Sequence, residues 1–167
     1  KFFFFIFVFI FSSNLSAETT ISFIDINYII ENSNSGKQIK EILKKKRIDE
    51  TKKLTVLQKE IKKEEEEIKK KNNILNETEK KERINSIRKK IEEYKVLKNK
   101  KEKQFNAKKA EYINTLLNEI NKIMLIYIEK NSIDLVVKKE NLVTGKKELD
   151  ITKVIFEELN KKKINFK

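Results

Sequence analysis

The sequence predicts an α+β protein in which a long antiparallel α-helical coiled-coil hairpin projects from a small β-strand body. Three observations support this fold class. Residues 36–130 contain no proline, and no glycine after Gly36. Apolar residues recur through this stretch mostly at steps of three, four or seven, as in a narrow coiled-coil seam. Runs rich in β-branched residues flank it, so we assign 18–35 and 131–167 to the body and 36–130 to the hairpin arm.

The apolar seam divides into an outgoing half, residues 39–75, and a returning half, residues 84–127. Between them, Asn76 followed by Glu79 fits an N-cap with a capping-box variant, and the surrounding residues 72–78 form the only loop-like cluster. Each arm would be about 60 Å long at about 1.5 Å per residue. The alternative is one unbroken helix of about 140 Å in an intermolecular coiled coil.

A turn placed at residues 77–78 brings two separate patterns into agreement. In that register Ile68 faces Ile87, so the apolar seams meet. The acidic block 64–67 then lies beside residues 88–90, which are all basic. Because the apolar and charge patterns give the same alignment independently, we predict the hairpin rather than the single helix.

Lysine dominates the charge of the chain, which is +13 overall, and there is no cysteine and no histidine. This composition excludes disulfides, thiol nucleophiles, the usual zinc sites and imidazole acid–base catalysis. Neighbouring carboxylates such as Glu64 and Glu65 fall on a predicted exposed helix without a pocket. We therefore predict no enzyme activity, no catalytic residue, no cofactor and no metal site.

A basic cluster surrounds the predicted turn. Excess positive charge of this kind favours anionic partners or electrostatic capture of other proteins. The alternative explanation is a compositional bias of the genome toward lysine. The candidate binding residues in this cluster are Lys69, Lys70, Lys71, Lys80, Lys81, Arg83, Arg88, Lys89 and Lys90.

Residues 1–17 have the pattern of a cleaved signal peptide. Lys1 is followed by ten apolar residues, and a run of small and polar residues then leads to Ala17. The apolar run is too short to span a bilayer comfortably. We predict export and a mature chain that begins near Glu18, with a retained membrane anchor as the alternative.

The body is predicted to contain three short strands, at 21–26, 133–137 and 142–144, and a final helix capped by Asp150. A short helix is possible at residues 28–30, and residues 32–36 form a break before the arm. Three short strands leave open edges, which pairing between copies of the chain would close. The candidate residues of this oligomer body are Ile24, Ile26, Leu135, Val136, Val137, Leu142 and Val143.

One combination of features matches a known family: the strand ISFIDI directly after a signal peptide, the charged hairpin, and the block IDLVVKKENLVTGKKELDITKVIFEEL after it. The positions in that block that match most closely are Asp134, Leu135, Val136, Val137, Asp150, Ile151 and Thr152. With these features the mature chain resembles the Skp/OmpH family of periplasmic chaperones over nearly its full length. The resemblance implies a homotrimer with a small β-barrel body, whose three helical arms enclose unfolded outer-membrane proteins.

The leading functional prediction is a periplasmic holdase chaperone, with the basic cluster as candidate client-binding surface. Such a protein holds unfolded clients by many weak contacts and needs no catalytic residue. Its expected partners are other copies of itself and unfolded outer-membrane proteins, with lipopolysaccharide or an anionic membrane surface as further candidates. The alternatives are a basic coiled coil that binds anionic lipid or nucleic acid, and a structural envelope spacer. Nucleic acid is not expected, because no nucleic-acid motif or base-stacking aromatic pattern is present.

Overall fold

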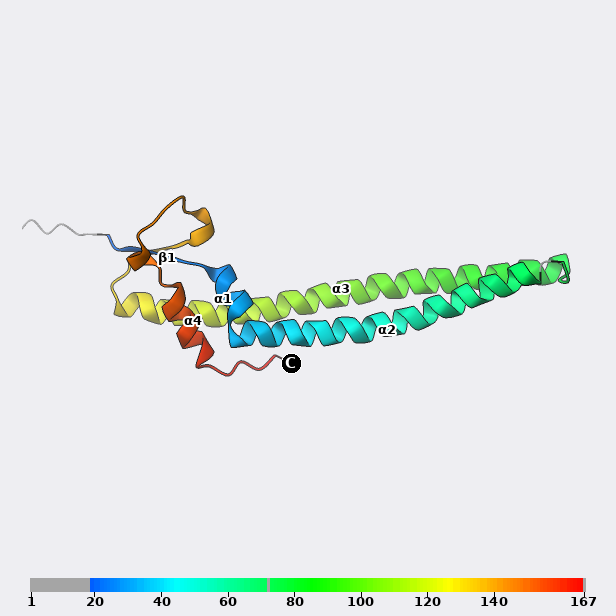
Figure 1. The fold of residues 1–167 in the computed structure, drawn as a ribbon, viewed down its shortest axis with the longest axis horizontal. Coiled ribbons are helices and arrows are strands. Elements are labelled where there is room, and N and C mark those ends of the chain that lie inside the picture. The colour runs from blue at the N-terminus through cyan, green and yellow to red at the C-terminus, as the bar shows by residue number, and fades with distance from the viewer. Residues whose placement is uncertain (1–18, 72, 167) are drawn as a thin grey trace, which may run out of the picture.

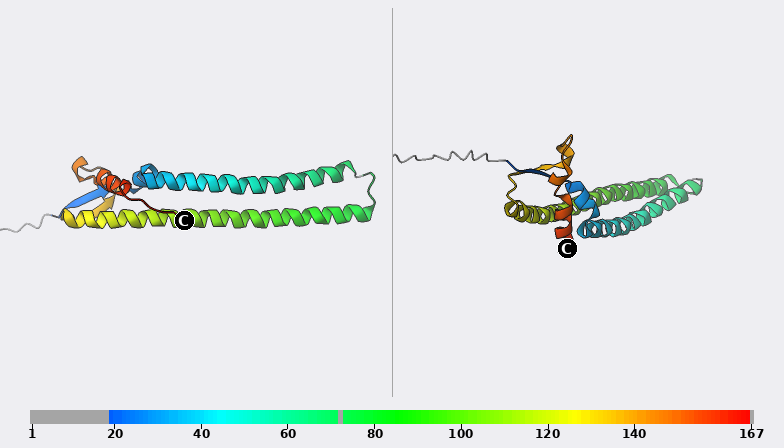
Figure 2. Two further views of the ribbon diagram at one scale, coloured as in Figure 1. Left: turned by 90° about the horizontal axis from the view of Figure 1, so that it is seen from below. Right: turned by 60° about the vertical axis from the view of Figure 1, so that its left-hand side comes forward.

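The computed structural model describes residues 19–71 and 73–166 as a long two-helix hairpin with a small body at its base (Figure 1). The outgoing arm is α2, Asn34–Lys70, and the returning arm is α3, Glu77–Lys130. The two helices run side by side along the molecule (Figure 2). The predicted α+β fold with an antiparallel helical hairpin is confirmed, and the single unbroken helix is wrong. The predicted signal peptide lies outside the described residues.

The turn between the arms lies between Lys70 and Glu77, and the structure describes residues 71 and 73–76 of it. The capping box predicted there is confirmed, because Glu79 N donates to Asn76 Oδ1 at 2.9 Å while Asn76 N donates to Glu79 Oε2 at 3.3 Å. The turn position predicted at 77–78 is wrong by a few residues. Once Asn76 caps α3, Glu77 and Thr78 fall within its first turn.

The predicted register nevertheless holds near the turn. Ile68 and Ile87 line the same small cavity between the arms. Lys90 Nζ pairs with the carboxylate of Glu64, which joins the acidic block to the basic block that was expected to face it. The pattern of apolar and charged side chains therefore predicts which residues of the two arms face each other more accurately than it predicts the position of the turn.

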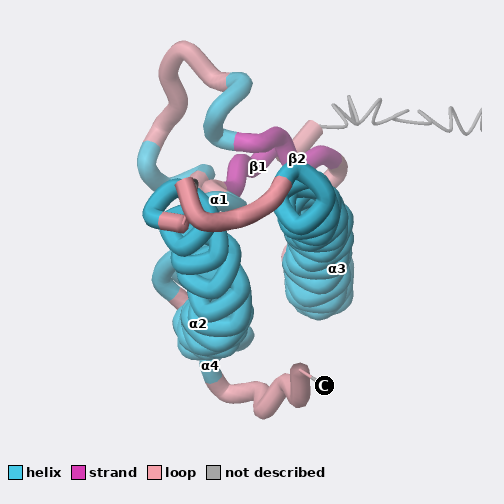
Figure 3. The backbone as a smooth tube through the Cα atoms, turned by 90° about the vertical axis from the view of Figure 1, so that its right-hand side faces the viewer, coloured by secondary structure: helices cyan, strands magenta, loops and turns pink. Residues whose placement is uncertain are grey.

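The body contains two parallel strands, β1 (Ile21–Ile24) and β2 (Leu135–Lys138), paired from Ile21 with Leu135 to Ile24 with Lys138. Figure 3 shows this pair beside the end of α3. The other side of β1 carries a single bridge, between Phe23 and Asp150, where Ile151 N donates to Phe23 O at 3.0 Å. Strand β1 is therefore the central element of the body.

Three details at the start of the predicted body differ from the structure. The first strand stops at Ile24, because the Asp25 carboxylate caps α1 (Ile26–Asn32) by accepting from Tyr28 N at 2.9 Å. Helix α1 includes the short helix expected at residues 28–30. The break before the arm is only Ser33, since α2 already begins at Asn34.

The third predicted strand, 142–144, is not formed. The 3₁₀ turn η1, Lys139–Asn141, precedes it, and a second 3₁₀ turn, η2, Lys147–Leu149, follows it. The chain reaches β1 only afterwards, at Asp150, which forms a single bridge with Phe23. The second strand begins at Leu135 rather than at residue 133.

Helix α4, Thr152–Asn160, covers the base of the hairpin. The predicted role of Asp150 needs a small correction. The N-cap residue is Ile151, and Asp150 is the residue before it. Asp150 Oδ1 accepts a hydrogen bond from Thr152 N at 2.9 Å. Asp25 N donates to Thr152 Oγ1 at 2.8 Å, so the starts of α1 and α4 are tied together.

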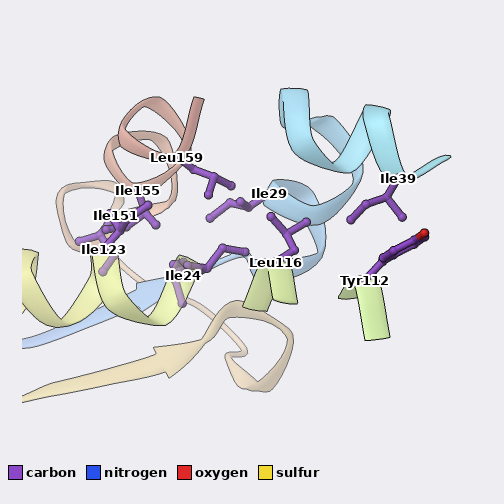
Figure 4. Packing of buried hydrophobic residues seen from close by; sticks show 10 residues of the cluster. Ile24, Ile29, Ile39, Tyr112, Leu116, Ile123, Ile151, Ile155 and Leu159 are labelled. Atoms are coloured by element: carbon purple, nitrogen blue, oxygen red, sulfur yellow. The ribbon is translucent and has the colours of Figure 1, made fainter. Parts of the chain in front are cut away.

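The hydrophobic core lies where the arms meet the body (Figure 4). Its buried members are Ile24, Ile29, Ile39, Tyr112, Leu116, Ile120, Ile123, Ile151, Ile155 and Leu159. At the corner between α1 and α2 the packing is so close that a Cβ on Gly36 would lie 1.7 Å from the Ile30 carbonyl oxygen. Of the helices in the part of the chain that the structure describes, none is both long and apolar enough to cross a bilayer.

Candidate functional site

The far end of the hairpin gathers the predicted basic cluster around one short turn, and we call residues 68–90 the tip. Lys69 and Lys70 are the last residues of α2, and Lys71 is its C-cap. Residues 80–90 lie in the first turns of α3. The tip contains nine basic residues and only three acidic residues, Glu77, Glu79 and Glu82. All nine basic residues are exposed except Lys80, which is half-buried.

Few of these charges are neutralised. Lys80 Nζ lies 3.3 Å from Glu77 Oε1, and Lys90 pairs with Glu64. Arg83 lines the same small cavity as Glu64 and Glu67. Among the described residues, the remaining basic side chains of the tip have no ion-pair partner within 4 Å: Lys69, Lys70, Lys71, Lys81, Arg83, Arg88 and Lys89. The tip is therefore a surface of largely uncompensated positive charge.

An apolar residue that the sequence reasoning missed lies in the turn itself. Ile74 is 83% exposed between the ends of the two arms, and Ile84 on the first turns of α3 is also exposed. The available signal was an isoleucine within a run of lysine and asparagine, where no packing partner could be expected. The tip thus offers apolar contact as well as charge.

The middle of the hairpin has a polar seam. Arg47 Nη1 donates to Glu102 Oε2 at 2.7 Å, and the guanidinium lies 4.8 Å from the centre of the Phe105 ring. Their hydrogen bond raises the pKa of Arg47 and lowers the pKa of Glu102. Glu50 and Tyr94 line the polar cavity beside this pair. In the outgoing half of the apolar seam, the successive members Leu43 and Leu54 are eleven positions apart, and the polar seam lies at this interruption.

The flank of α2 at the same height is apolar. Ile48 and Val56 are exposed and line a shallow groove with Thr51 and Thr55. Arg47 and Lys52 complete the lining of this groove. Among the described residues there is no cluster of three histidine, cysteine or acidic side chains that could hold a metal ion.

The predicted oligomer residues occupy different environments. Ile24 is buried in the core of its own protomer, whereas Leu135 and Val143 are exposed. The other members of the set are half-buried, namely Ile26, Val136, Val137 and Leu142. Strand β2 pairs with β1 along one edge, and within the described residues no strand lies against its other edge. The body therefore presents an open strand edge beside exposed apolar side chains.

The arrangement of a long charged hairpin on a small two-stranded body agrees with the comparisons with known proteins. The sequence profile of the family described as "Outer membrane protein (OmpH-like)" matches residues 20–159. The chain belongs to the OmpH-like family. Among curated proteins, none matches it.

A solved structure shares the fold of this OmpH-like chain. It is the crystal structure of a candidate outer membrane chaperone (OmpH-like) from Caulobacter crescentus, with a TM-score of 0.78 and 14% sequence identity. The match covers 87% of this chain and 86% of the other. At that identity the likeness concerns the fold alone. The family match of the OmpH-like chain includes the body, both arms and α4, and it stops before the residues that follow α4.

Proposed function

We propose that the chain is an exported holdase chaperone that binds unfolded outer-membrane proteins in the periplasm and prevents their aggregation. Membership of the OmpH-like family supports a chaperone role. The observation that carries the proposal is the tip, where exposed basic side chains without ion-pair partners lie far from the core that stabilises the fold. Such a surface is available to clients without any rearrangement of the body.

The physical mechanism needs no reaction. An exposed ion pair contributes at most about 1 kcal/mol, and salt screens charges beyond about 8 Å at physiological ionic strength. A single lysine therefore holds a client weakly, whereas many lysines together raise the rate and selectivity of capture. Binding to the unfolded state lowers its free concentration and hence its aggregation. Weak contacts also allow release without an energy source.

The holdase function is tested by diluting a urea-unfolded outer-membrane β-barrel protein into buffer with and without the purified mature chain. We expect light scattering to fall as the chaperone is added, and we expect a soluble complex on gel filtration. Scattering that is unchanged at a several-fold excess of the chain would overturn the proposal. A mature N-terminus at Glu18 in protein isolated from the periplasm, read by mass spectrometry, is the matching test of export.

Assembly into a homotrimer through the body is part of the proposal. The open edge of β2 and the exposed side chains of Leu135 and Val143 support contact between copies. Val136 packs against the protomer's own core, whereas Leu135 on the same strand is 50% exposed. Leu135→Asp should therefore dissociate the oligomer while the helical content stays unchanged. Ile24→Asp is unsuitable for this test, because Ile24 is buried in the protomer's own core and its loss would unfold the body.

One observation favours a second candidate function, the binding of an anionic lipid surface such as lipopolysaccharide. Ile74 is exposed within the basic turn, and an apolar side chain surrounded by lysines is a typical interfacial contact. Flotation with vesicles that contain anionic lipid tests this function, with neutral vesicles as the control. Flotation that Ile74→Ser abolishes would support lipid binding, whereas no flotation in either case would exclude it.

A further inference from the structure

Residues 161–166, which we call the strap, leave the end of α4 and run beside the base of the arms (Figures 1 and 2). Lys162 Nζ lies 3.3 Å from Glu119 Oε2 on α3. Further along, the Phe166 ring meets the Tyr112 ring edge to face, with 5.6 Å between centroids and an interplanar angle of 71°. The strap lies beyond residue 159, where the family match ends.

The side chains of the strap alternate along its extended part. Ile164 and Phe166 are half-buried and pack against the core cluster, whereas Lys163 and Asn165 are exposed. A period of two is that of an extended strand lying on an apolar surface. Residues 163–166 nevertheless form no helix and pair with no strand of the described chain. The base of the arms around Tyr112 therefore accepts an extended segment through its side chains rather than through backbone pairing.

The strap is held by weak contacts. Its ion pair to Glu119 is partly exposed, with 42% of the Lys162 side chain accessible, and exposed pairs contribute little to stability. Hydrogen bonds from Lys122 and Lys162 lower the pKa of Glu119 although burial opposes the shift, so this carboxylate is charged and already shared with Lys122. Among the described residues of the strap, the apolar side chains of Ile164 and Phe166 add to this attachment, and both are half-buried. A segment with better apolar contacts could replace it.

We propose that the surface beside Tyr112 is a binding site for extended segments with apolar side chains at alternate positions, and that the strap occupies it until such a segment displaces it. Strands of membrane β-barrels have this pattern, because lipid-facing and interior-facing residues alternate. The inference rests on the proposed function, for which it names a second contact surface in addition to the tip. Because the strap competes from within the same chain, its effective concentration is high and it weakens the apparent affinity for every other occupant.

The test compares two uncharged fluorescent peptides of ten residues and identical composition, one alternating apolar and polar residues and one carrying the apolar residues as a block. Their anisotropy is titrated with the mature chain, with a chain ending at Lys163, and with a full-length Ile164→Ser/Phe166→Ser variant. We expect both altered chains to bind the alternating peptide at least tenfold more tightly than the parent, and to bind the block peptide poorly. Val56→Ser/Val96→Ser, which changes exposed apolar residues on the arms, is the matched control and should behave as the parent.

Equal affinity of the parent and both altered chains for the alternating peptide would overturn the inference. No binding of either peptide, or equal binding of the two, would overturn it as well. Circular dichroism and hydrogen exchange of the arm base show whether each variant is folded, and the full-length serine variant keeps the test valid if the shortened chain is not. Suppression of the aggregation of a whole β-barrel protein is scored separately. Its failure would count against the holdase function, while the peptide comparison alone decides the role of the strap.

Discussion

The base and the tip of the hairpin use opposite kinds of residue. At the base, Leu116 and Ile120 of α3 are fully buried in one core cluster with Ile155 and Leu159 of α4. At the tip, Ile87 is the only buried residue among those described between 68 and 90. The residues that stabilise the fold and the residues that carry unpaired positive charge therefore lie at opposite ends of the same two helices. Each can therefore be changed with little effect on the other, and the free energy of unfolding of variants at the two ends tests that separation.

Truncation of the core at the base should have the largest effect. Leu116 is fully buried at the junction of arm and body. Leu116→Ala removes its apolar contacts and leaves a cavity, so we expect a loss of about 2–5 kcal/mol of unfolding free energy. Ile84→Ala at the tip, where the side chain is exposed, should stay within about 0.5 kcal/mol of the parent. Urea titration followed by circular dichroism measures both, and equal losses would contradict the separation.

A smaller loss is expected at the corner between α1 and α2. The methyl group of Gly36→Ala would lie 1.7 Å from the Ile30 carbonyl oxygen, so backbone must move, and we expect a destabilisation of about 1–3 kcal/mol. Gly145→Ala is the matched control. There the nearest atom, at 2.9 Å, belongs to the Phe23 side chain, which can shift. Thermal unfolding of the two variants should therefore rank Gly36→Ala as the less stable; the reverse order would contradict the packing at this corner.

The acid sensitivity of the body should depend on Asp150. Burial alone would raise its pKa, but hydrogen bonds from Thr152 and the nearby charge of Lys139 outweigh this and lower it. A carboxylate with a lowered pKa in the folded state stabilises the protein above its unfolded pKa of about 3.9, and this contribution is lost as the pH falls through the lower folded value. Asp150→Asn should therefore flatten the loss of stability below about pH 4.

Unfolding by urea at a series of acidic pH values measures this effect. Asp49→Asn, at an exposed position on α2, is the control and should keep the acid profile of the parent. An Asp150→Asn profile that superimposes on the parent profile would show that other carboxylates set the acid limit.

Neutralising the tip should have the smallest effect on stability and a clear effect on capture. Replacing Lys69, Lys70, Lys80 and Lys81 by glutamine should change the unfolding free energy by less than about 0.5 kcal/mol, since these are mostly exposed surface positions. Stopped-flow capture of an acidic, urea-diluted β-barrel protein should become slower and less dependent on salt.

The matched control replaces four exposed lysines far from the tip by glutamine, namely Lys130 at the end of α3 and Lys146, Lys147 and Lys153 of the body. It removes the same total charge, so a capture rate like that of the parent would locate the electrostatic contribution at the tip. Equal slowing by both sets would mean that net charge, rather than the position of the lysines, governs capture.

The sequence predicts the arms well because they repeat one rule over many residues. Seam spacing, the capping box at Asn76 and the facing charges of Glu64 and Lys90 are all local or periodic signals. The body is predicted less accurately. Its strands are only four residues long, and whether a segment forms a strand depends on which edge of the neighbouring strand is free to pair with it. The expected strand at 142–144 has suitable side chains, yet Asp150 occupies the second edge of β1. The strap carries no periodic signal long enough to read, and its site emerges only from the contact between Phe166 and Tyr112.

The parallel pairing of β1 and β2 also favours one order of folding over the others. Thr20 and Asp134, at the start of this pairing, are 114 positions apart in the chain, and closing so long a loop from an unordered chain is slow. The hairpin removes this difficulty, because its helices can pair progressively from the turn at the tip. Each step closes only a short loop, and the last step brings β2 next to β1. The body would then form last. An unpaired β1 would be exposed throughout that interval, so the tip, although it adds little to stability, would control how quickly the base becomes protected.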